Sequence, residues 1–133
     1  MTPDTSVLVA GFASWHEHHS AAATALRDVD VVIGHVLLET YSVLTRLPAG
    51  QRAEPGLVER FLAQFTGTSP LALTGDQTAD LVRRCAAAGI DGGATYDALI
   101  ARTADAHGRV LLTRDQRAAR TYAALGTRFE LLR

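Results

Sequence analysis

Hydrophobic residues along the chain alternate between short apolar runs and longer stretches with helical spacing. The run Val29–Ile33 is rich in valine and isoleucine and stops at Gly34, and Arg109–Thr113 is a clearer run of the same kind. Runs of this length predict buried strands. A weak strand is expected at Leu71–Leu73, and a last one, at an edge of the sheet, at Phe129–Leu132.

Between these runs, apolar residues recur at intervals of three and four, which predicts helices. One helix is expected over His35–Leu47, where Pro48 stops it, and another over 57–65, after a loop rich in proline and glycine. Further helices are expected over about 76–88, 95–106 and from Asp115 to Leu125. Alternating strands and helices predict an α/β fold, with a parallel sheet flanked by helices on both faces.

Composition narrows the functional classes. The chain has 133 residues, 47% hydrophobic and 20% charged, which predicts one domain over residues 1–133 and excludes a disordered tail or a disulfide scaffold. All thirteen positive side chains are arginine. Without lysine there is no Schiff base and no P-loop lysine. The lone Cys85 is expected to be a small buried hydrophobe, which fits a reducing, cytoplasmic compartment, and no membrane segment is expected.

Two aspartates follow predicted strands directly. Asp4 would end a first, N-terminal strand, and Asp115 comes just after Arg109–Thr113. Ligands of open parallel sheets bind outside the carboxyl ends of the strands. Helix N-capping explains either aspartate equally well, and one residue can serve both purposes.

Two further acids have mostly apolar neighbours in the sequence. Glu39 falls in the middle of an apolar helix, and Asp97 near the start of another. Taken alone, Glu39 is better explained by an ion pair with Arg46 or Arg102. Taken together, the four acids are better explained by a shared cation that keeps them ionised, and an oxygen-only set favours Mg²⁺ or Mn²⁺.

Four segments in this order resemble a known family. They are Asp4–Ala10, Glu39–Pro48, Tyr96–Ala101 and Leu112–Asp115. Together they resemble the PIN-domain ribonucleases, and within them the VapC-type toxins of bacterial toxin–antitoxin pairs. All four acids expected of the family have a counterpart, and Thr113 stands where the family has a hydroxyl near the metal.

The resemblance implies a three-layer fold and an endoribonuclease that leaves a 5′-phosphate and a 3′-hydroxyl. Asp4, Asp97 and Asp115 would hold the metal, and Glu39 would ligate it or orient the attacking water. It also implies a homodimer, a structured RNA substrate such as a tRNA or rRNA whose cleavage slows translation, and a VapB-type antitoxin that blocks the site.

The arginines and histidines have less specific interpretations than the acids. The net charge is −1, but it becomes positive once four acids are assigned to a metal. Arg114, Arg117 and Arg120 are candidates for RNA phosphates, or simply solvate a helix. The cluster of His16, His18 and His19 lacks the spacing of a zinc site and is expected at an exposed helix start or at a groove rim. His35 and His107 are expected to be structural or at the surface.

Other functions remain open from the sequence. A phosphatase of the haloacid-dehalogenase type would want Asp-x-Asp where the chain has Asp4-Thr5-Ser6. A non-catalytic interaction module would use the acids as caps and ion pairs. The apolar stripe within 57–65 is expected to be core, with part of it available to line a groove for an antitoxin helix.

Overall fold

The computed structural model describes residues 1–133 as three short strands and seven helices. In chain order these are β1 (Thr2–Pro3), α1 (Thr5–Phe12), α2 (His19–Leu26), α3 (Gly34–Thr45), α4 (Pro55–Ala63), α5 (Gly75–Ala88), α6 (Ala94–Ala106), β2 (Leu111–Thr113), α7 (Gln116–Ala124) and β3 (Phe129–Leu131). None of the helices combines the length and the apolarity needed to cross a bilayer.

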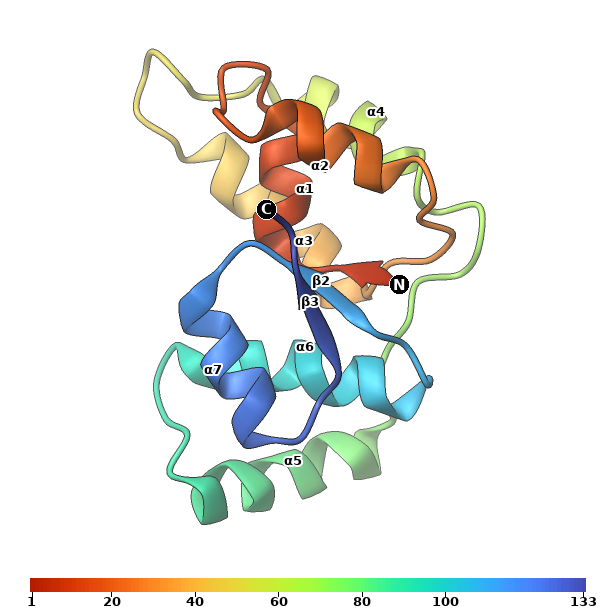
Figure 1. Ribbon diagram of the computed structural model, residues 1–133, viewed down its shortest axis with the longest axis vertical. Helices are drawn as coiled ribbons and strands as arrows, with labels where there is room; N and C mark the ends of the chain where they lie inside the picture. The colour runs from red at the N-terminus through yellow and green to blue at the C-terminus, as the bar shows by residue number, and fades with distance from the viewer.

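The strands form one parallel sheet in the order β1-β2-β3. Helices α1 and α2 lie on one side of it and α6 and α7 on the other, which confirms the predicted α/β arrangement in three layers (Figure 1). Strand β3 is at the edge, as expected. Since all three strands are parallel, the residues after β1 and after β2 emerge at the same end of the sheet.

The predicted strand at Val29–Ile33 is wrong in extent. Val31, Val32 and Ile33 are fully buried, as the apolar run indicates, but only Ile33 pairs with another strand-like residue, in a single parallel bridge to Leu71. The Thr2 hydroxyl donates to the Val31 carbonyl at 3.1 Å, which ties this segment to β1 through a side chain. The apolar pattern of this segment therefore reflects its burial, although its backbone does not form a full ladder of hydrogen bonds.

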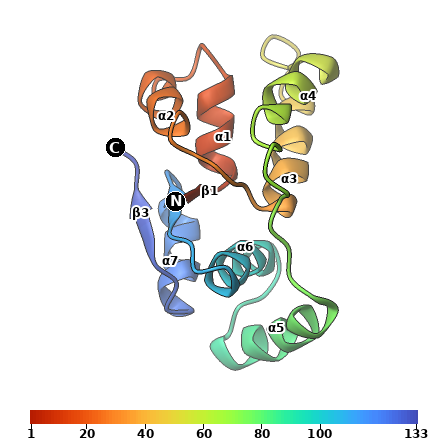
Figure 2. The same cartoon turned by 90° about the vertical axis from the view of Figure 1, so that its right-hand side faces the viewer.

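A helix start was expected at the histidine cluster, but the course of helix α2 was not predicted, because its sequence gives little periodicity: only Ala22 and Leu26 are buried. It packs against α1 at Gly11, where a Cβ atom would lie 2.3 Å from Leu26 Cδ1. The two helices therefore approach closely at Gly11, and any larger residue there would force the Leu26 side chain to move. Figure 2 shows α1 and α2 side by side, with the α3–α4 pair across from them.

The main core fills the space between the sheet and its helices. Its largest fully buried side chains include Leu8, Leu111 and Tyr122. A smaller cluster of Leu81, Cys85 and Ala98 joins α5 to α6, so the prediction for Cys85 is confirmed.

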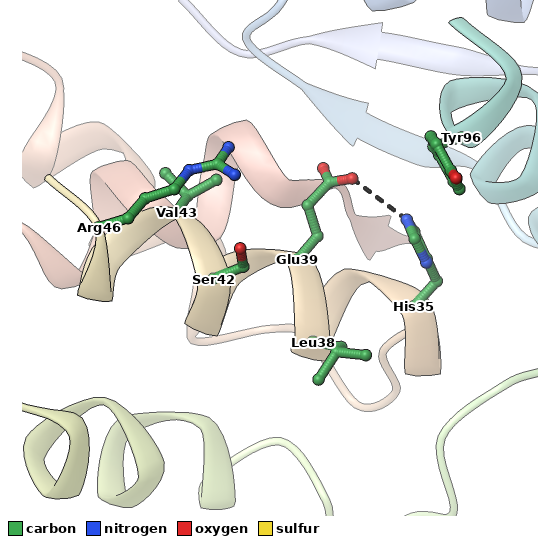
Figure 3. Close-up of a pocket in the computed structure, with 7 residues that line it drawn as sticks. All are labelled: His35, Leu38, Glu39, Ser42, Val43, Arg46 and Tyr96. Carbon is green, nitrogen blue, oxygen red and sulfur yellow. Dashed lines mark hydrogen bonds and ion pairs between the residues drawn. The ribbon is translucent and has the colours of Figure 1, made fainter. Parts of the chain in front are cut away.

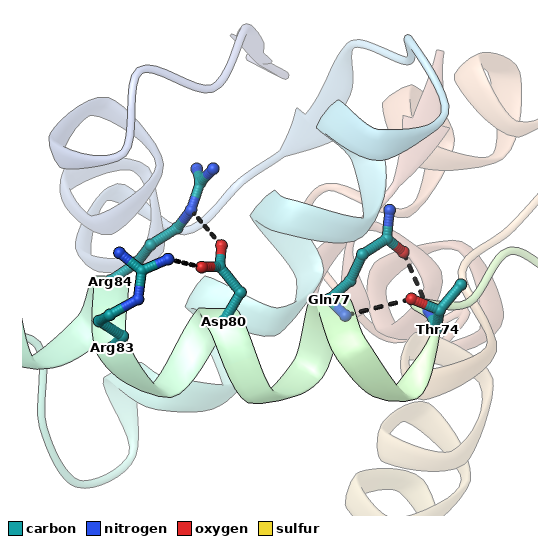
Figure 4. A network of polar contacts seen from close by, with 5 residues as sticks. All are labelled: Thr74, Gln77, Asp80, Arg83 and Arg84. Carbon is teal, nitrogen blue, oxygen red and sulfur yellow. Dashed lines mark hydrogen bonds and ion pairs between the residues drawn. The ribbon is translucent and has the colours of Figure 1, made fainter.

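Helix α5 is stabilised by its own polar side chains (Figure 4). Thr74 and Gln77 form a reciprocal capping box, with hydrogen bonds of 3.1 and 2.9 Å. Asp80 pairs with both Arg83 and Arg84 one turn further on. The capping box satisfies the first turn of α5, and the ion pairs lie in the middle of the helix. Since α5 lies far from the carboxyl ends of the strands, these contacts are structural.

Candidate active site

Asp4 is held rigidly at the carboxyl end of β1. Its Oδ1 atom caps α1, accepting from the Ser6 amide at 3.0 Å and from the Ser6 hydroxyl at 2.5 Å. Its Oδ2 atom accepts from the Tyr122 hydroxyl at 2.9 Å. Asp4 is only 3% exposed, and burial raises its pKa although these hydrogen bonds act in the opposite direction. The capping interpretation is thus correct, and a carboxylate with room for about four hydrogen bonds still has acceptor capacity left.

Asp115 occupies the matching position after β2. One of its oxygens, Oδ1, caps α7 by accepting from the amides of Arg117 and Ala118 at 2.8 and 3.2 Å. Its second oxygen accepts no hydrogen bond, and the residue is exposed. Asp115 therefore offers one free carboxylate oxygen to a ligand.

Ser6 and Thr113 link the two strand ends. The Ser6 hydroxyl accepts from the Arg114 amide at 2.8 Å and lies 3.5 Å from the buried Thr113 hydroxyl, which in turn accepts from the Asp115 amide at 3.0 Å. The two hydroxyls fix the position of Asp115 relative to Asp4. Ser6 was missed by the sequence reasoning, although its place two residues after a capping aspartate was an available signal.

Asp97 lies in the first turn of α6 and is partly buried. Its pKa is raised to about 6, first by burial and then by repulsion from Asp115, Glu39 and Asp4, while Arg117 acts in the opposite direction. The Asp97 carboxylate accepts no hydrogen bond from the protein. The fold therefore brings all four predicted acids into one electrostatic neighbourhood around an uncompensated carboxylate.

Glu39 does not pair with Arg46 or Arg102, so that interpretation is wrong. It pairs instead with His35, one turn earlier on α3, at 3.1 Å between Oε2 and Nε2 (Figure 3). The His35 ring stacks on Tyr96, next to Asp97. His35, assigned to structure or surface from the sequence, is thus in contact with a site residue, and its spacing of four from Glu39 was the signal.

The donor set suits a hard divalent cation, because every candidate ligand is a carboxylate or hydroxyl oxygen and the four acids repel one another. A cation would relieve that repulsion. As the side chains stand, no three histidine, cysteine, aspartate or glutamate residues are grouped to hold a metal. Binding would therefore involve reorientation of side chains such as Asp97, which no hydrogen bond restrains.

The three candidate arginines occupy different surroundings. Arg117 is close enough to Asp97 to lower the pKa of that carboxyl. The pKa of His16 is lowered first by burial and then by the positive charge of Arg114. Arg120 lines a pocket of about 300 Å³ beside Phe129 and Leu131 of β3. Contact with RNA stays a prediction for all three.

The histidine cluster is held by local contacts. His19 begins α2, so a helix does start at this cluster as expected, but His16, His18 and His19 are half-buried rather than exposed. The Nδ1 atom of His19 lies 3.0 Å from the Ala10 carbonyl of α1. His16 Nδ1 accepts from the His18 amide at 3.1 Å, and His18 pairs with Glu17. Of these contacts, the one between His19 and Ala10 joins α1 to α2, and the other two lie within the turn between the helices.

The apolar stripe of α4 is mostly core, as predicted. Val58, Leu62 and Phe65 are buried, and Leu57 is the member left exposed.

Comparisons with known proteins agree on one family. The PIN domain family matches residues 1–124. Ribonuclease VapC40 of Mycobacterium tuberculosis is 50% identical over 132 residues, which cover 99% of this chain and 98% of that protein. Ribonuclease VapC27 of the same organism is 42% identical over 125 residues, 92% of this chain and 90% of that protein. The crystal structure of M. tuberculosis VapC20, a sarcin-ricin loop cleaving toxin, has a similar fold, with a TM-score of 0.72, 19% identity and coverage of 95% of each chain.

Proposed function

Because the chain belongs to the PIN-domain family, and within it to the VapC-type toxins, we propose that it is a divalent-metal-dependent endoribonuclease with its catalytic centre at Asp4, Glu39, Asp97 and Asp115. One observation carries the assignment of the centre. The Asp97 carboxylate has no hydrogen-bond partner, and burial together with the field of the three other acids raises its pKa to about 6. A purely structural aspartate would be paired or capped.

Three residues would hold the cation, Mg²⁺ or Mn²⁺. Asp4 supplies a rigid, buried oxygen, Asp115 an oxygen that no amide occupies, and Asp97 a carboxylate free to turn. Thr113 positions Asp115 through its amide. The bound cation would supply Lewis-acid activation of water and stabilisation of charge on the phosphate.

The chain's own groups would direct hydrolysis of the phosphodiester. Glu39, restrained by His35, would help to hold the cation or would orient a water whose oxygen attacks the phosphorus. The new P–O bond would replace the bond between phosphorus and the 3′ oxygen. The water would lose one proton and the 3′ oxygen would gain one, so that the products are a 3′-hydroxyl and a 5′-phosphate on the downstream fragment. Arg117, close enough to influence Asp97, provides positive charge for the RNA backbone.

The biological setting follows from the same premise. We propose that residues 1–133 act as a single PIN-like domain, in a cytoplasmic homodimer, on a structured RNA such as a tRNA or rRNA. Cleavage would inhibit translation, and a cognate VapB-type antitoxin would neutralise the toxin by covering the acidic site. Light scattering of the isolated chain tests the dimer, and loss of nuclease activity on co-purification with the antitoxin tests the neutralisation.

The decisive experiment compares the wild type with Asp97→Asn and Asp91→Asn. Asp91 is an exposed aspartate in the turn before α6 and is the matched control. Each protein is incubated with total bacterial RNA and Mn²⁺, with EDTA as a blank, and new 5′-phosphate ends are mapped by sequencing. We expect discrete metal-dependent ends with the wild type and Asp91→Asn, and none with Asp97→Asn. Equal cleavage by all three proteins would remove Asp97 from the catalytic centre, and no cleavage by any of them would contradict the proposed activity.

A further inference from the structure

A groove of about 510 Å³ adjoins the acidic site along α3. Glu39 lines it, so the groove opens directly onto one of the four acids. His35 and Tyr96 form one end and Arg46 the other, with Ser42 between them (Figure 3). The catalytic assignment above uses only Glu39 and His35 from this groove.

Tyr96 is an aromatic ring presented to solvent beside the site. It is 57% exposed, so core packing does not account for it. It stacks on the His35 ring with a centroid separation of 5.6 Å and an interplanar angle of 7°. Since the Glu39 carboxylate holds His35, the pair is a flat surface whose orientation is set before any ligand arrives.

Flat, exposed aromatic surfaces are what proteins use to bind unpaired bases. Every nucleobase has a π-face, so stacking on tyrosine tolerates many sequences and requires only that the base be splayed out of its helix. Tyr96 stacks on His35, which is hydrogen-bonded to Glu39, so a base on the Tyr96 ring would lie beside one of the acids proposed to cut the backbone.

Arg46 complements this surface at the other end of the groove. Its side chain makes no hydrogen bond or ion pair with the protein, although Glu39 is only two turns away on the same helix. Its guanidinium points over Ser42 toward the groove rather than away from it (Figure 3). An unpaired arginine in this position is suited to a phosphate of the same strand.

We propose that the Tyr96–His35 pair is a platform on which one unpaired base of the RNA stacks beside the acidic site, while Arg46 binds a backbone phosphate of the same strand. This proposal rests on the proposed ribonuclease function. It makes an unpaired segment, such as a loop, the substrate at the point of cleavage. Tyr96 is then a binding residue, and the hydrolysis itself depends on the four acids.

The test is RNA binding measured in EDTA, where no cleavage interferes. The probe is a short single-stranded RNA of mixed sequence that carries the fluorescent adenine analogue 2-aminopurine, whose emission falls on stacking. Affinity is followed by anisotropy for the wild type, Tyr96→Phe, Tyr96→Ala and Arg46→Gln. The matched control is Tyr41→Ala, an exposed tyrosine of α3 that does not line this groove.

We expect Tyr96→Ala to raise the Kd about tenfold and to abolish the quenching of the analogue, because one stacking contact is lost. Tyr96→Phe keeps the ring and should retain both properties. Arg46→Gln should reduce the slope of log Kd against log salt by about 0.7, the value for one phosphate contact on a single strand. Circular dichroism checks that each variant is folded.

Several results would overturn the platform: wild-type affinity and quenching in Tyr96→Ala, an equal loss in Tyr41→Ala, or no binding of the probe by the wild type. The parallel cleavage assay with Mn²⁺ separates the two proposals. Cleavage that depends on Asp97 but has a KM indifferent to Tyr96→Ala refutes the platform alone. Binding that depends on Tyr96, without any cleavage, refutes the nuclease alone.

Discussion

Replacing Asp97 with asparagine should stabilise the protein at neutral pH while removing its activity. The carboxylate is partly buried, lacks a hydrogen-bond partner and is repelled by Asp115, Glu39 and Asp4. Asparagine keeps the shape of the side chain but carries no charge. A group placed for function in this way is held at a cost in stability, and the variant recovers that cost.

The size of the effect follows from the pKa of Asp97, which rises from 3.8 to about 6. A shift of about two pH units corresponds to at most about 3 kcal/mol at 1.36 kcal/mol per unit. Since Asp97 is only half buried, solvent screening makes the actual energy smaller than this upper bound. We expect the free energy of unfolding of Asp97→Asn to exceed that of the wild type by about 1 to 2 kcal/mol.

The effect should depend on pH in one direction. A carboxyl with a raised pKa in the folded state contributes stability that is fully present below pH 3.8 and is lost as the pH rises through about 6. The wild type should therefore lose stability relative to Asp97→Asn between about pH 4 and pH 6, and the difference should stay constant above that window. Urea unfolding in EDTA at a series of pH values measures it, with Asp91→Asn as the control that follows the wild type.

Two results would refute this reasoning. One is an Asp97→Asn variant that is no more stable than the wild type at pH 7.5 with an unchanged m-value. The other is a stability difference that does not change between pH 4 and pH 7. Either would mean that the charge of Asp97 is compensated in the folded protein, and the electrostatic argument for the four-acid centre would lose its basis.

Three other substitutions test individual contacts that stabilise the fold. Tyr122→Phe keeps a fully buried ring but removes the 2.9 Å hydrogen bond to Asp4, and should cost about 2 kcal/mol in urea unfolding; an unchanged midpoint would show that Asp4 does not need this donor. Thr74→Ala opens the capping box of α5 and should cost about 1 kcal/mol in thermal unfolding while RNA cleavage stays at the wild-type rate. Gly11→Ala places a methyl group 2.3 Å from Leu26 Cδ1 and should cost about 1 to 3 kcal/mol. In a double-mutant cycle that cost should shrink in the Leu26→Ala background, and simple additivity would count against the close contact.

The sequence predicted the fold class better than its details. The helices over 35–47 and 76–88 were found to within about two residues, because their apolar spacing and their proline and glycine boundaries are local signals. The strand at Val29–Ile33 was overestimated, since an apolar run reports burial whether or not the backbone pairs. The course of helix α2 beyond its start was missed, because it is rich in alanine and only Ala22 and Leu26 reach the core.

The candidate site was likewise predicted in part. The four acids could be named from the sequence, because each is a charged residue in an apolar or strand-end setting and together they match a family pattern. The partner of Glu39 was predicted wrongly, as Arg46 or Arg102, although the spacing of four between His35 and Glu39 was a usable signal. The stacking of His35 on Tyr96 was not visible in the sequence, because the two residues are far apart in the chain.

Taken by itself, the sequence determined which residues are apolar, where the helices with clear apolar spacing and proline or glycine boundaries begin and end, and which carboxylates have apolar or strand-end neighbours. These features depend on residues a few positions away. Only the tertiary structure decided that residues 4, 39, 97 and 115 share one electrostatic field, and that Tyr96 lies open on His35 beside them. The physical reason is that parallel strands and the helices packed on them bring together residues far apart in the chain, and the energy of a charge depends on what surrounds it in space.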